Sequence, residues 1–252
     1  MASESASVTT EASISASGLI RMYGARAALD HLDLEVGRGE SVALFGPNGA
    51  GKTTLIRILT LGLRASGGSF SICGLHPRRD DLQIRRRIGL VSHESFLYDD
   101  LTAEENLIFF ARLYGLADPL ARATKLLDAF GLARRAADPV RAYSRGMRQR
   151  ASLARALVHD PELVFLDEPF SGLDPHAARI LQQRLERLRG NRRTILLVTH
   201  DLGSGLALSD RWIVLRRGRV AAEGRSSQTD PIEFERWYHE QFAEPDAQRR
   251  TE

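Results

Sequence analysis

The chain has 252 residues, of which 43% are hydrophobic and 27% charged, a composition typical of a globular protein with a large core. Its 35 basic and 32 acidic residues leave a formal net charge of +3, and no basic run is interleaved with aromatic residues, so we predict no nucleic-acid partner. The single cysteine, Cys73, excludes an intrachain disulfide and fits a reducing compartment.

The first 13 residues are rich in Ser, Ala and Thr and lack the basic region and apolar core of a secretory signal. We expect residues 1–13 to form a disordered lead-in. No stretch of the sequence approaches the ~18 uncharged apolar residues that a spanning helix needs, so the sequence predicts no membrane-spanning helix.

Strands and helices alternate along the predicted folded domain, which covers residues 14–224. Apolar clusters flanked by glycine predict strands at 32–36, 41–45, 70–73, 163–166, 195–199 and 212–215, and helical spacing appears at 52–63, 103–114, 120–130, 145–157 and 175–189. This order predicts an α/β fold with a largely parallel sheet that is covered on both faces.

Three parts of the chain depart from that alternation. Residues 14–45 contain predicted strands without helices between them, which favours an antiparallel β layer. Residues from about 93 to 160 are rich in predicted helices and suggest an inserted α-helical subdomain. Residues 225–252 form a charged C-terminal tail, in which Trp237 and Tyr238 are expected to anchor a terminal helix by burial.

A phosphate-binding loop is predicted between the strand at 41–45 and the helix at 52–63. The run Gly46-Pro47-Asn48-Gly49-Ala50-Gly51-Lys52-Thr53 fits the pattern G-x-x-x-x-G-K-[ST], and we assign it, with Thr54, to nucleotide binding. Glycines let backbone amides turn toward phosphate oxygens, and the helix start adds a partial positive charge.

Lysine occurs only at positions 52 and 125, whereas arginine supplies the remaining basic residues. The lysine at 52 therefore indicates a site that needs an ammonium group. We expect Lys52 to contact the β- and γ-phosphates of a nucleotide and the Thr53 hydroxyl to hold Mg²⁺. The alternative is a glycine-rich loop that arises by chance.

Two adjacent carboxylates follow the apolar run Leu163–Leu166. Asp167 and Glu168 would stand at the carboxyl end of a buried strand, where open α/β sheets bind ligands. Asp167 suits Mg²⁺ through a bound water, and Glu168 suits polarisation of an attacking water as a general base. A strand followed by an acidic turn is the alternative interpretation.

Further residues resemble motifs of the ATP-binding subunits of ABC transporters. The run Tyr143-Ser144-Arg145-Gly146-Met147 resembles the ABC signature, usually Leu-Ser-Gly-Gly-Gln, and Ser171-Gly172-Leu173-Asp174 resembles the D-loop. His200, after the predicted strand at 195–199, is similar to the switch histidine, and Tyr23 stands where the family keeps the aromatic residue that stacks on adenine. The resemblance covers about residues 14–224.

This resemblance implies a P-loop NTPase core of the ABC ATPase type, with an antiparallel β-subdomain and an inserted α-helical subdomain. It implies ATP and Mg²⁺ as ligands, and a nucleotide-dependent homodimer in which each ATP lies between one P-loop and the other copy's signature. Membrane transporter subunits on separate chains would be the further partners, at the cytoplasmic face of the membrane. Ser144 stands at the start of a predicted helix, so its hydroxyl and nearby amides can bind phosphate in trans.

The sequence departs from the family pattern at Arg145, where the signature usually has glycine, and at Met147, where it has glutamine. Arg145 either adds charge near the γ-phosphate or points outward into solvent, and outward is the expectation. His93 stands at the Q-loop position, where the family has a glutamine that senses Mg²⁺ and water. A histidine can still donate or accept a hydrogen bond there, and a plain surface histidine is the alternative.

Within the family, residues 92–107, 143–150 and 167–175 resemble the haem-exporter ATPase of cytochrome c maturation. ATPases of drug, lipid and polysaccharide exporters share most of these residues and stay open as alternatives. A soluble ABC ATPase acting on ribosomes or DNA is less favoured, because the chain has one cassette and no sustained heptads. A P-loop kinase or GTPase would leave the signature and His200 unexplained.

Overall fold

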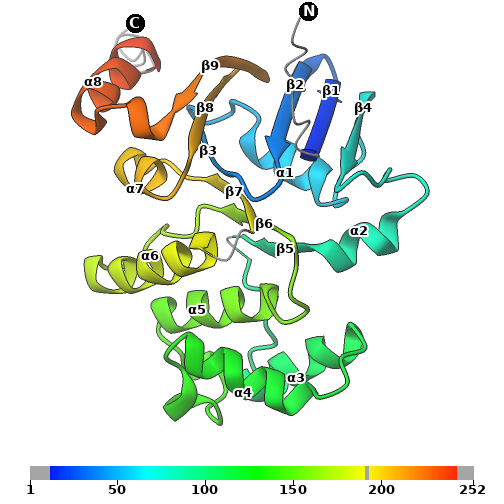
Figure 1. The fold of residues 1–252 in the computed structure, drawn as a ribbon, viewed down its shortest axis with the longest axis vertical. Coiled ribbons are helices and arrows are strands. Elements are labelled where there is room, and N and C mark those ends of the chain that lie inside the picture. The colour runs from blue at the N-terminus through cyan, green and yellow to red at the C-terminus, as the bar shows by residue number, and fades with distance from the viewer. Residues whose placement is uncertain (1–11, 93, 191–192, 243–252) are drawn as a thin grey trace, which may run out of the picture.

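Two β-sheets form the centre of the fold in the computed structural model, which describes residues 12–92, 94–190 and 193–242 (Figure 1). The helices and strands are β1 Ala12–Tyr23, β2 Arg26–Gly37, β3 Ser41–Phe45, α1 Lys52–Leu59, β4 Gly67–Ile72, α2 Asp81–Arg87, β5 Ile88–Val91, α3 Ala103–Leu113, α4 Pro119–Ala129, α5 Arg145–Ala156, β6 Leu163–Asp167, α6 Pro175–Gly190, β7 Thr194–Val198, α7 Leu202–Ala207, β8 Arg211–Arg216, β9 Arg219–Arg225 and α8 Pro231–Phe242.

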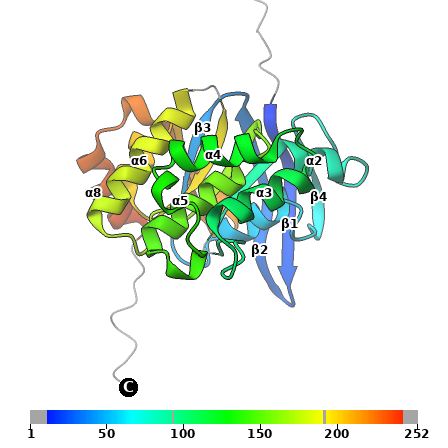
Figure 2. The same cartoon turned by 90° about the horizontal axis from the view of Figure 1, so that it is seen from below.

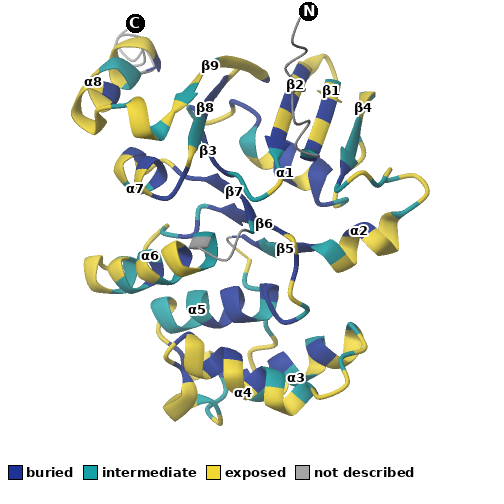
Figure 3. Cartoon of the chain, viewed as in Figure 1, coloured by how far each residue is buried: buried dark blue, intermediate teal, exposed yellow. Residues whose placement is uncertain are grey.

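The larger sheet has six strands in the order β5-β6-β7-β3-β8-β9, and all neighbours are parallel except β8 and β9. Every residue of β3, β6 and β7 is buried, as expected for parallel strands covered on both faces (Figure 3). Because these three strands are parallel neighbours, the loops that follow them emerge at one edge of the sheet. The predicted alternating α/β core is therefore confirmed.

The smaller sheet is antiparallel and has the strand order β2-β1-β4. Leu19 of β1 and Leu29 of β2 pack in one buried cluster with Leu55 and Ile58 of α1, so this sheet supports the helix that follows the glycine-rich loop. The antiparallel layer was predicted over 14–45, but residues 41–45 form β3 of the larger sheet, and β4 supplies the third strand instead.

Helix α1 ends at Leu59, earlier than the predicted end at residue 63. Its last turn is closed by the Thr60 hydroxyl, which donates a hydrogen bond to the Ile56 carbonyl over 2.8 Å. The next residue, Leu61, has a φ of 63°, which an α-helix does not accommodate. The apolar pattern in the sequence therefore remains helical beyond Leu59, although the backbone leaves the helix there.

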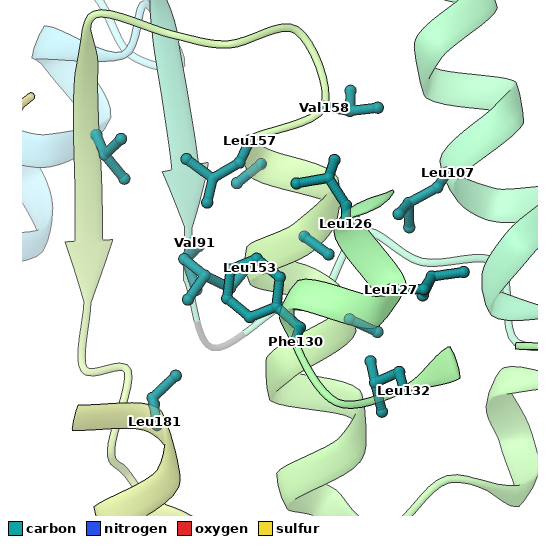
Figure 4. Close-up of a cluster of buried hydrophobic side chains, with 14 of the residues drawn as sticks. Val91, Leu107, Leu126, Leu127, Phe130, Leu132, Leu153, Leu157, Val158 and Leu181 are labelled. Atoms are coloured by element: carbon teal, nitrogen blue, oxygen red, sulfur yellow. The ribbon is translucent and has the colours of Figure 1, made fainter. Parts of the chain in front are cut away.

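Helices α3, α4 and α5 lie between β5 and β6 in the chain and form a separate layer, seen from below in Figure 2. Their facing side chains build a buried cluster with Val91 of β5, including Leu107, Leu126 and Leu153 (Figure 4). A capping box fixes the start of α3, with Thr102 bonded to the Glu105 amide and Glu105 bonded back to Thr102. Helix α5 therefore packs against both α3 and α4 and against β5 of the larger sheet.

The last helix, α8, packs against the parallel sheet. The ring of Phe234 lies 5.6 Å from that of Phe45, the final residue of β3, and 4.7 Å from that of Trp212. Trp237 and Tyr238 are half-buried and pack against the same cluster. The C-terminal helix therefore contacts the strand that leads into the glycine-rich loop.

Candidate nucleotide site

The loop between β3 and α1 has a backbone that only glycine allows at its two ends. Gly46 has a φ of 145° and Gly51 a φ of 108°. A Cβ on Gly46 would overlap the Leu215 carbonyl, and one on Gly51 would overlap the Ala28 carbonyl. Gly51 precedes the first residue of α1 and offers no side-chain cap, so the first amides of the helix keep no side-chain partner from the capping position. This geometry presents backbone N–H groups to an anion.

Lys52, the first residue of α1, folds back over this loop. Its Nζ donates hydrogen bonds to the carbonyls of Gly46 and Pro47, the latter over 3.1 Å. Burial lowers the pKa of Lys52, and the nearby Glu168 and Asp167 carboxylates act in the opposite direction. The predicted lysine and the predicted pair of carboxylates therefore lie close enough to interact electrostatically.

The two carboxylates differ in their surroundings at the end of β6. Asp167 is buried and pairs in register with Val198 of β7, whereas Glu168 is half-buried and follows the strand. Glu168 has a φ of 52°, a left-handed conformation uncommon for a residue with a side chain, and its amide donates to the Val198 carbonyl over 2.9 Å. The turn places Glu168 directly after the end of the buried strand.

His200 meets Glu168 from the neighbouring strand end. Its Nδ1 lies 2.7 Å from Oε2 of Glu168, and its backbone amide faces the same oxygen at 3.4 Å. His200 itself is exposed, and it follows the buried Thr199 after β7. The candidate base and the candidate switch residue are therefore in direct contact in this state.

Tyr23 lies at the tip of the hairpin between β1 and β2 and is 49% exposed. The Arg21 guanidinium lies over the Tyr23 ring, 4.8 Å from its centroid. On the other side of the hairpin turn, Nη2 of Arg26 stands 3.0 Å from the position that a Cβ on Gly49 would occupy. The hairpin that carries the exposed tyrosine therefore abuts the glycine-rich loop, and Arg26 is a neighbour of the site that the sequence alone did not indicate.

The segment Ser144–Met147, which we call the signature segment, opens helix α5. The exposed Ser144 is its N-cap, and the hydroxyl accepts a 3.3 Å hydrogen bond from the Met147 amide. Neither α1 nor α5 has an acidic residue in its first turn, so no carboxylate there opposes an anion. The predicted helix start at Ser144 is therefore present, with its hydroxyl engaged in capping.

Arg145 is exposed, in keeping with the expected outward direction, and its guanidinium also covers the face of Gly172, where a Cβ would overlap it. Asp174, two residues further on, caps α6 through a 2.9 Å bond from the Ala177 amide, and this bond holds the pKa of its carboxyl below the usual value. The signature and D-loop segments of one chain are therefore in contact.

Sequence reasoning missed Arg155 at the far end of α5. Its Nη2 donates to the Leu90 carbonyl over 2.6 Å, and its guanidinium lies over the rings of Phe96 and Phe110. Burial lowers the pKa of Arg155 to about 10. This arginine ties α5 to the loop that follows β5. His93, placed by sequence in that loop, lies outside the described residues, and its role stays a prediction.

The model of a protein family described as ABC transporter matches residues 29–171, more than half of the chain. The chain belongs to the ABC transporter family. The match contains the P-loop, the Asp167-Glu168 pair and the signature segment, whereas His200 and α8 lie beyond it. The chain is therefore an ABC ATPase, as the order of its motifs predicted, and ATP is the nucleotide that this family binds.

Relatives within the ABC transporter family agree with this assignment. A daunorubicin resistance ATP-binding protein of Streptomyces coeruleorubidus is 41% identical over 220 residues, which cover 86% of this chain and 70% of that protein. The Nod factor export ATP-binding protein I of Cupriavidus pinatubonensis is 41% identical over 208 residues, 81% of this chain and 64% of that protein. The matched region thus spans about two thirds of these relatives' own length.

Solved structures show the same fold. An ATP-binding cassette, solved as a dimer in a post-hydrolysis state with ADP and Pi, superposes with a TM-score of 0.78 at 28% identity over 84% of this chain and 98% of that one. An ATP-binding subunit of an ABC transporter gives the same TM-score at 33% identity, covering 91% of this chain and 93% of its own. The predicted ABC ATPase fold is therefore confirmed. No helix in the described parts of the chain is both long and apolar enough to cross a bilayer.

Proposed function

We propose that this ABC ATPase powers an exporter, working at the cytoplasmic face of the membrane on membrane subunits encoded as separate chains. The observation that carries the proposal is the gathering of Lys52, Asp167, Glu168 and His200 at one edge of the parallel sheet, with His200 in contact with Glu168 at 2.7 Å. Such an arrangement binds a triphosphate and places a carboxylate beside the water that attacks the γ-phosphate.

The residues divide the work according to their positions. The P-loop amides and Lys52 bind the phosphates, and Tyr23 offers an exposed ring to the adenine. Glu168 orients the attacking water, and His200 holds the Glu168 carboxylate through Nδ1. The Lys52 ammonium now donates to the carbonyls of Gly46 and Pro47. It would leave these partners to bind the β- and γ-phosphates.

The donor set fits Mg²⁺. Thr53 is exposed on the first turn of α1 and Asp167 is buried at the end of β6, so both offer the oxygen atoms that Mg²⁺ prefers. No cluster of three or more His, Cys, Asp or Glu residues that could hold a metal occurs in the described ranges. Phosphate and water oxygens would be further ligands of the ion. When bound, the ion would neutralise charge on the phosphates.

A second copy of the chain would complete the site. Ser144, Arg145, Gly146 and Met147 lie at or near the exposed start of α5, where a phosphate from another subunit can approach. Support comes from the solved ATP-binding cassette that is dimeric with ADP and Pi bound. We therefore propose a homodimer that ATP holds together and hydrolysis opens.

The proposed cargo follows the relatives rather than the initial resemblance. The two relatives described above bear names that refer to daunorubicin resistance and Nod factor export, and neither name refers to haem. A small amphipathic compound of the drug or lipo-oligosaccharide class is thus favoured over haem. Comparing cell accumulation of an anthracycline and the level of c-type cytochromes in a deletion strain would separate the two. Loss of cytochromes alone would restore the haem proposal.

The variant Glu168→Gln tests the proposed reaction. It removes the general base but keeps the shape of the side chain, so ATP should bind, remain intact and trap a dimer that size-exclusion chromatography detects. Glu162→Gln is the matched control, because Glu162 is an exposed carboxylate just before β6, at the opposite end of the strand. A Glu168→Gln protein that stays monomeric with saturating ATP and with its membrane partners present would contradict the dimer.

A further inference from the structure

Arg145 occupies a position that joins two segments of the chain. A Cβ built on Gly172 would overlap Cζ, Nη1 and Nη2 of Arg145, so the whole guanidinium plane covers the glycine. Gly172 has a φ of 66°, so the backbone here also favours glycine for conformational reasons. A side chain at 172 would therefore displace the arginine.

The contact of the Arg145 guanidinium with Gly172 is a packing contact and not a polar one. Within the described ranges of the chain, no hydrogen bond or ion pair of the Arg145 guanidinium is found, although the neighbouring Arg148 pairs with Asp99. The guanidinium plane packs against the Gly172 backbone, so Arg145 brings the start of α5 into contact with the segment that contains Gly172.

A second contact lies next to the first. A Cβ on Gly146 would stand 2.9 Å from the Cβ of Ala177, so the first turns of α5 and α6 pack closely. The covered segment also leads back to the catalytic carboxylate, because the Ser171 amide bonds to the Glu168 carbonyl over 3.1 Å. The start of α5 therefore contacts the short chain segment that continues from Glu168.

We propose that Arg145 is a positioning residue that clamps the D-loop segment, Ser171–Asp174, onto the start of α5, so that both parts of the surface facing the second copy move together. The proposal rests on the proposed ATP-dependent dimer for its consequence, but the clamp itself is a property of the single chain. It assigns a role to the residue that replaces the usual first glycine of the signature. A direct contact of Arg145 with the partner's γ-phosphate is the competing outcome.

Amide hydrogen exchange in the ATP-free full-length chain tests the clamp. Arg145→Ala keeps a good helix former at this position and removes the guanidinium. The amides of residues 171–173 should then exchange about fivefold faster or more, because local opening no longer has to break the contact. Unchanged exchange in these residues would overturn the clamp, whatever happens to ATP hydrolysis.

Arg145→Lys separates packing from charge. A lysine keeps the positive charge but has no planar group to cover Gly172. The clamp predicts that Arg145→Lys exchanges its amides as fast as Arg145→Ala and loses as much ATP turnover. If only the positive charge acts, on the partner's phosphate, lysine should largely restore ATP turnover. Restoration of turnover together with unaltered exchange would establish the competing outcome instead.

A double-mutant cycle provides a functional test. Gly172→Ala should lower ATP turnover much more with Arg145 present than in Arg145→Ala, because only the former contains a guanidinium to displace. Gly131→Ala is the matched control, since Gly131 has a φ of 67° and its nearest neighbour would be an arginine nitrogen at 3.7 Å, an ordinary contact. Equal fold-changes for Gly172→Ala in both backgrounds would exclude a functional clamp. A wild-type chain without ATP turnover would instead refute the proposed function, and the exchange experiment would still decide the clamp.

Discussion

The starts of helices α1 and α5, which follow the P-loop and open with the signature segment respectively, are built differently. Helix α1 follows Gly51, which has a left-handed backbone and no capping side chain, and only the loop of residues 46–51 separates it from the buried strand β3. Helix α5 follows Ser144, which is exposed and already caps the helix through its own hydroxyl. The first amides of α1 have no capping side chain, whereas at α5 the Met147 amide is already bonded to the Ser144 hydroxyl, whose O–H can still donate to an anion.

This difference indicates which helix start should bind the nucleotide tightly and which should form the reversible dimer contact. A helix start with uncapped amides inside a rigid sheet edge loses little entropy when a phosphate binds, so it should hold the nucleotide in the single chain. A start that is exposed and self-capped binds more weakly on its own, so it suits a contact that forms and breaks in every cycle. Changes near α1 should therefore affect nucleotide binding, and changes near α5 should affect the dimer.

The largest effect is expected from Lys52→Ala. Loss of the only ammonium at the sheet edge should lower ATP turnover by about a thousandfold, or roughly 4 kcal/mol, because the phosphates lose their main protein cation. Lys125→Ala is the control, since Lys125 is the other lysine and lies exposed on α4. Turnover of purified protein measures both, and retained activity in Lys52→Ala would break the assignment of α1 to the phosphates.

A smaller but still large effect should follow Gly51→Ala. Its φ of 108° is unfavourable for alanine, and the new methyl group would overlap the Ala28 carbonyl. We expect a loss of at least about 3 kcal/mol in unfolding free energy, with weaker ATP binding. Gly24→Ala should cost only about 1 kcal/mol, because Gly24 also has a positive φ but nothing lies within 4 Å of a Cβ there. Similar losses in urea unfolding would show that the close approach of β2 is unimportant.

His159 should make the far end of α5 sensitive to acid. Burial lowers the pKa of His159 from 6.5 to about 4, while its Nε2 lies 2.9 Å from the Ile88 carbonyl and its ring stacks on Tyr114. Because the unfolded chain binds the proton more tightly, this contribution to stability is complete above pH 6.5 and is lost as the pH falls toward 4. The loss should reach up to about 3 kcal/mol.

Urea unfolding at a series of pH values measures this effect. His159→Gln keeps a side-chain donor but does not titrate, so its stability should fall less between pH 6.5 and 4 than that of the wild type. Parallel curves for the two proteins would mean that His159 is not held neutral. A larger acid sensitivity of the wild type would place the acid-sensitive contact at the buried end of α5. The exposed start of α5, which is compared above with the start of α1, would then not be the acid-sensitive part.

The smallest expected effect belongs to Ser144→Ala. Loss of the cap should lower the unfolding free energy by about 1 kcal/mol. The important result is selective: ATP binding by the single chain should be unchanged, whereas ATP-dependent dimerisation in a Glu168→Gln background should weaken. Asp118→Ala is the control, because Asp118 caps α4 through a 2.9 Å bond from the Ala121 amide. If both cap variants weakened the dimer equally, helix stability would explain the effect.

The sequence was sufficient wherever the position of a residue in the fold depends on its neighbours in the chain. The P-loop, its lysine and the Asp167-Glu168 pair could be predicted, because a strand, a turn and a helix start follow one another and a parallel sheet brings the strand ends together. The N-cap role of Ser144 is also local and was foreseen in the helix that begins there.

Contacts between distant segments could not be predicted in this way. Arg145 over Gly172, Arg26 beside Gly49 and Arg155 under the loop after β5 all depend on how separate elements pack. The positive φ of Glu168 was also hidden, because a glutamate carries no signal for a left-handed backbone. The early end of α1 was missed for a similar reason, since Leu61 fits the helical apolar pattern.

The packing of α8 has a practical consequence for anyone who manipulates this protein. Phe234 packs against Phe45 at the end of β3, and Phe45 in turn lies against Gly205 of α7, the helix that follows β7. A purification tag or a deletion that disturbs Pro231–Phe242 would therefore remove packing from Phe45, the residue that immediately precedes the P-loop. Expression vectors with the tag at the amino end are the safer choice for measuring catalysis.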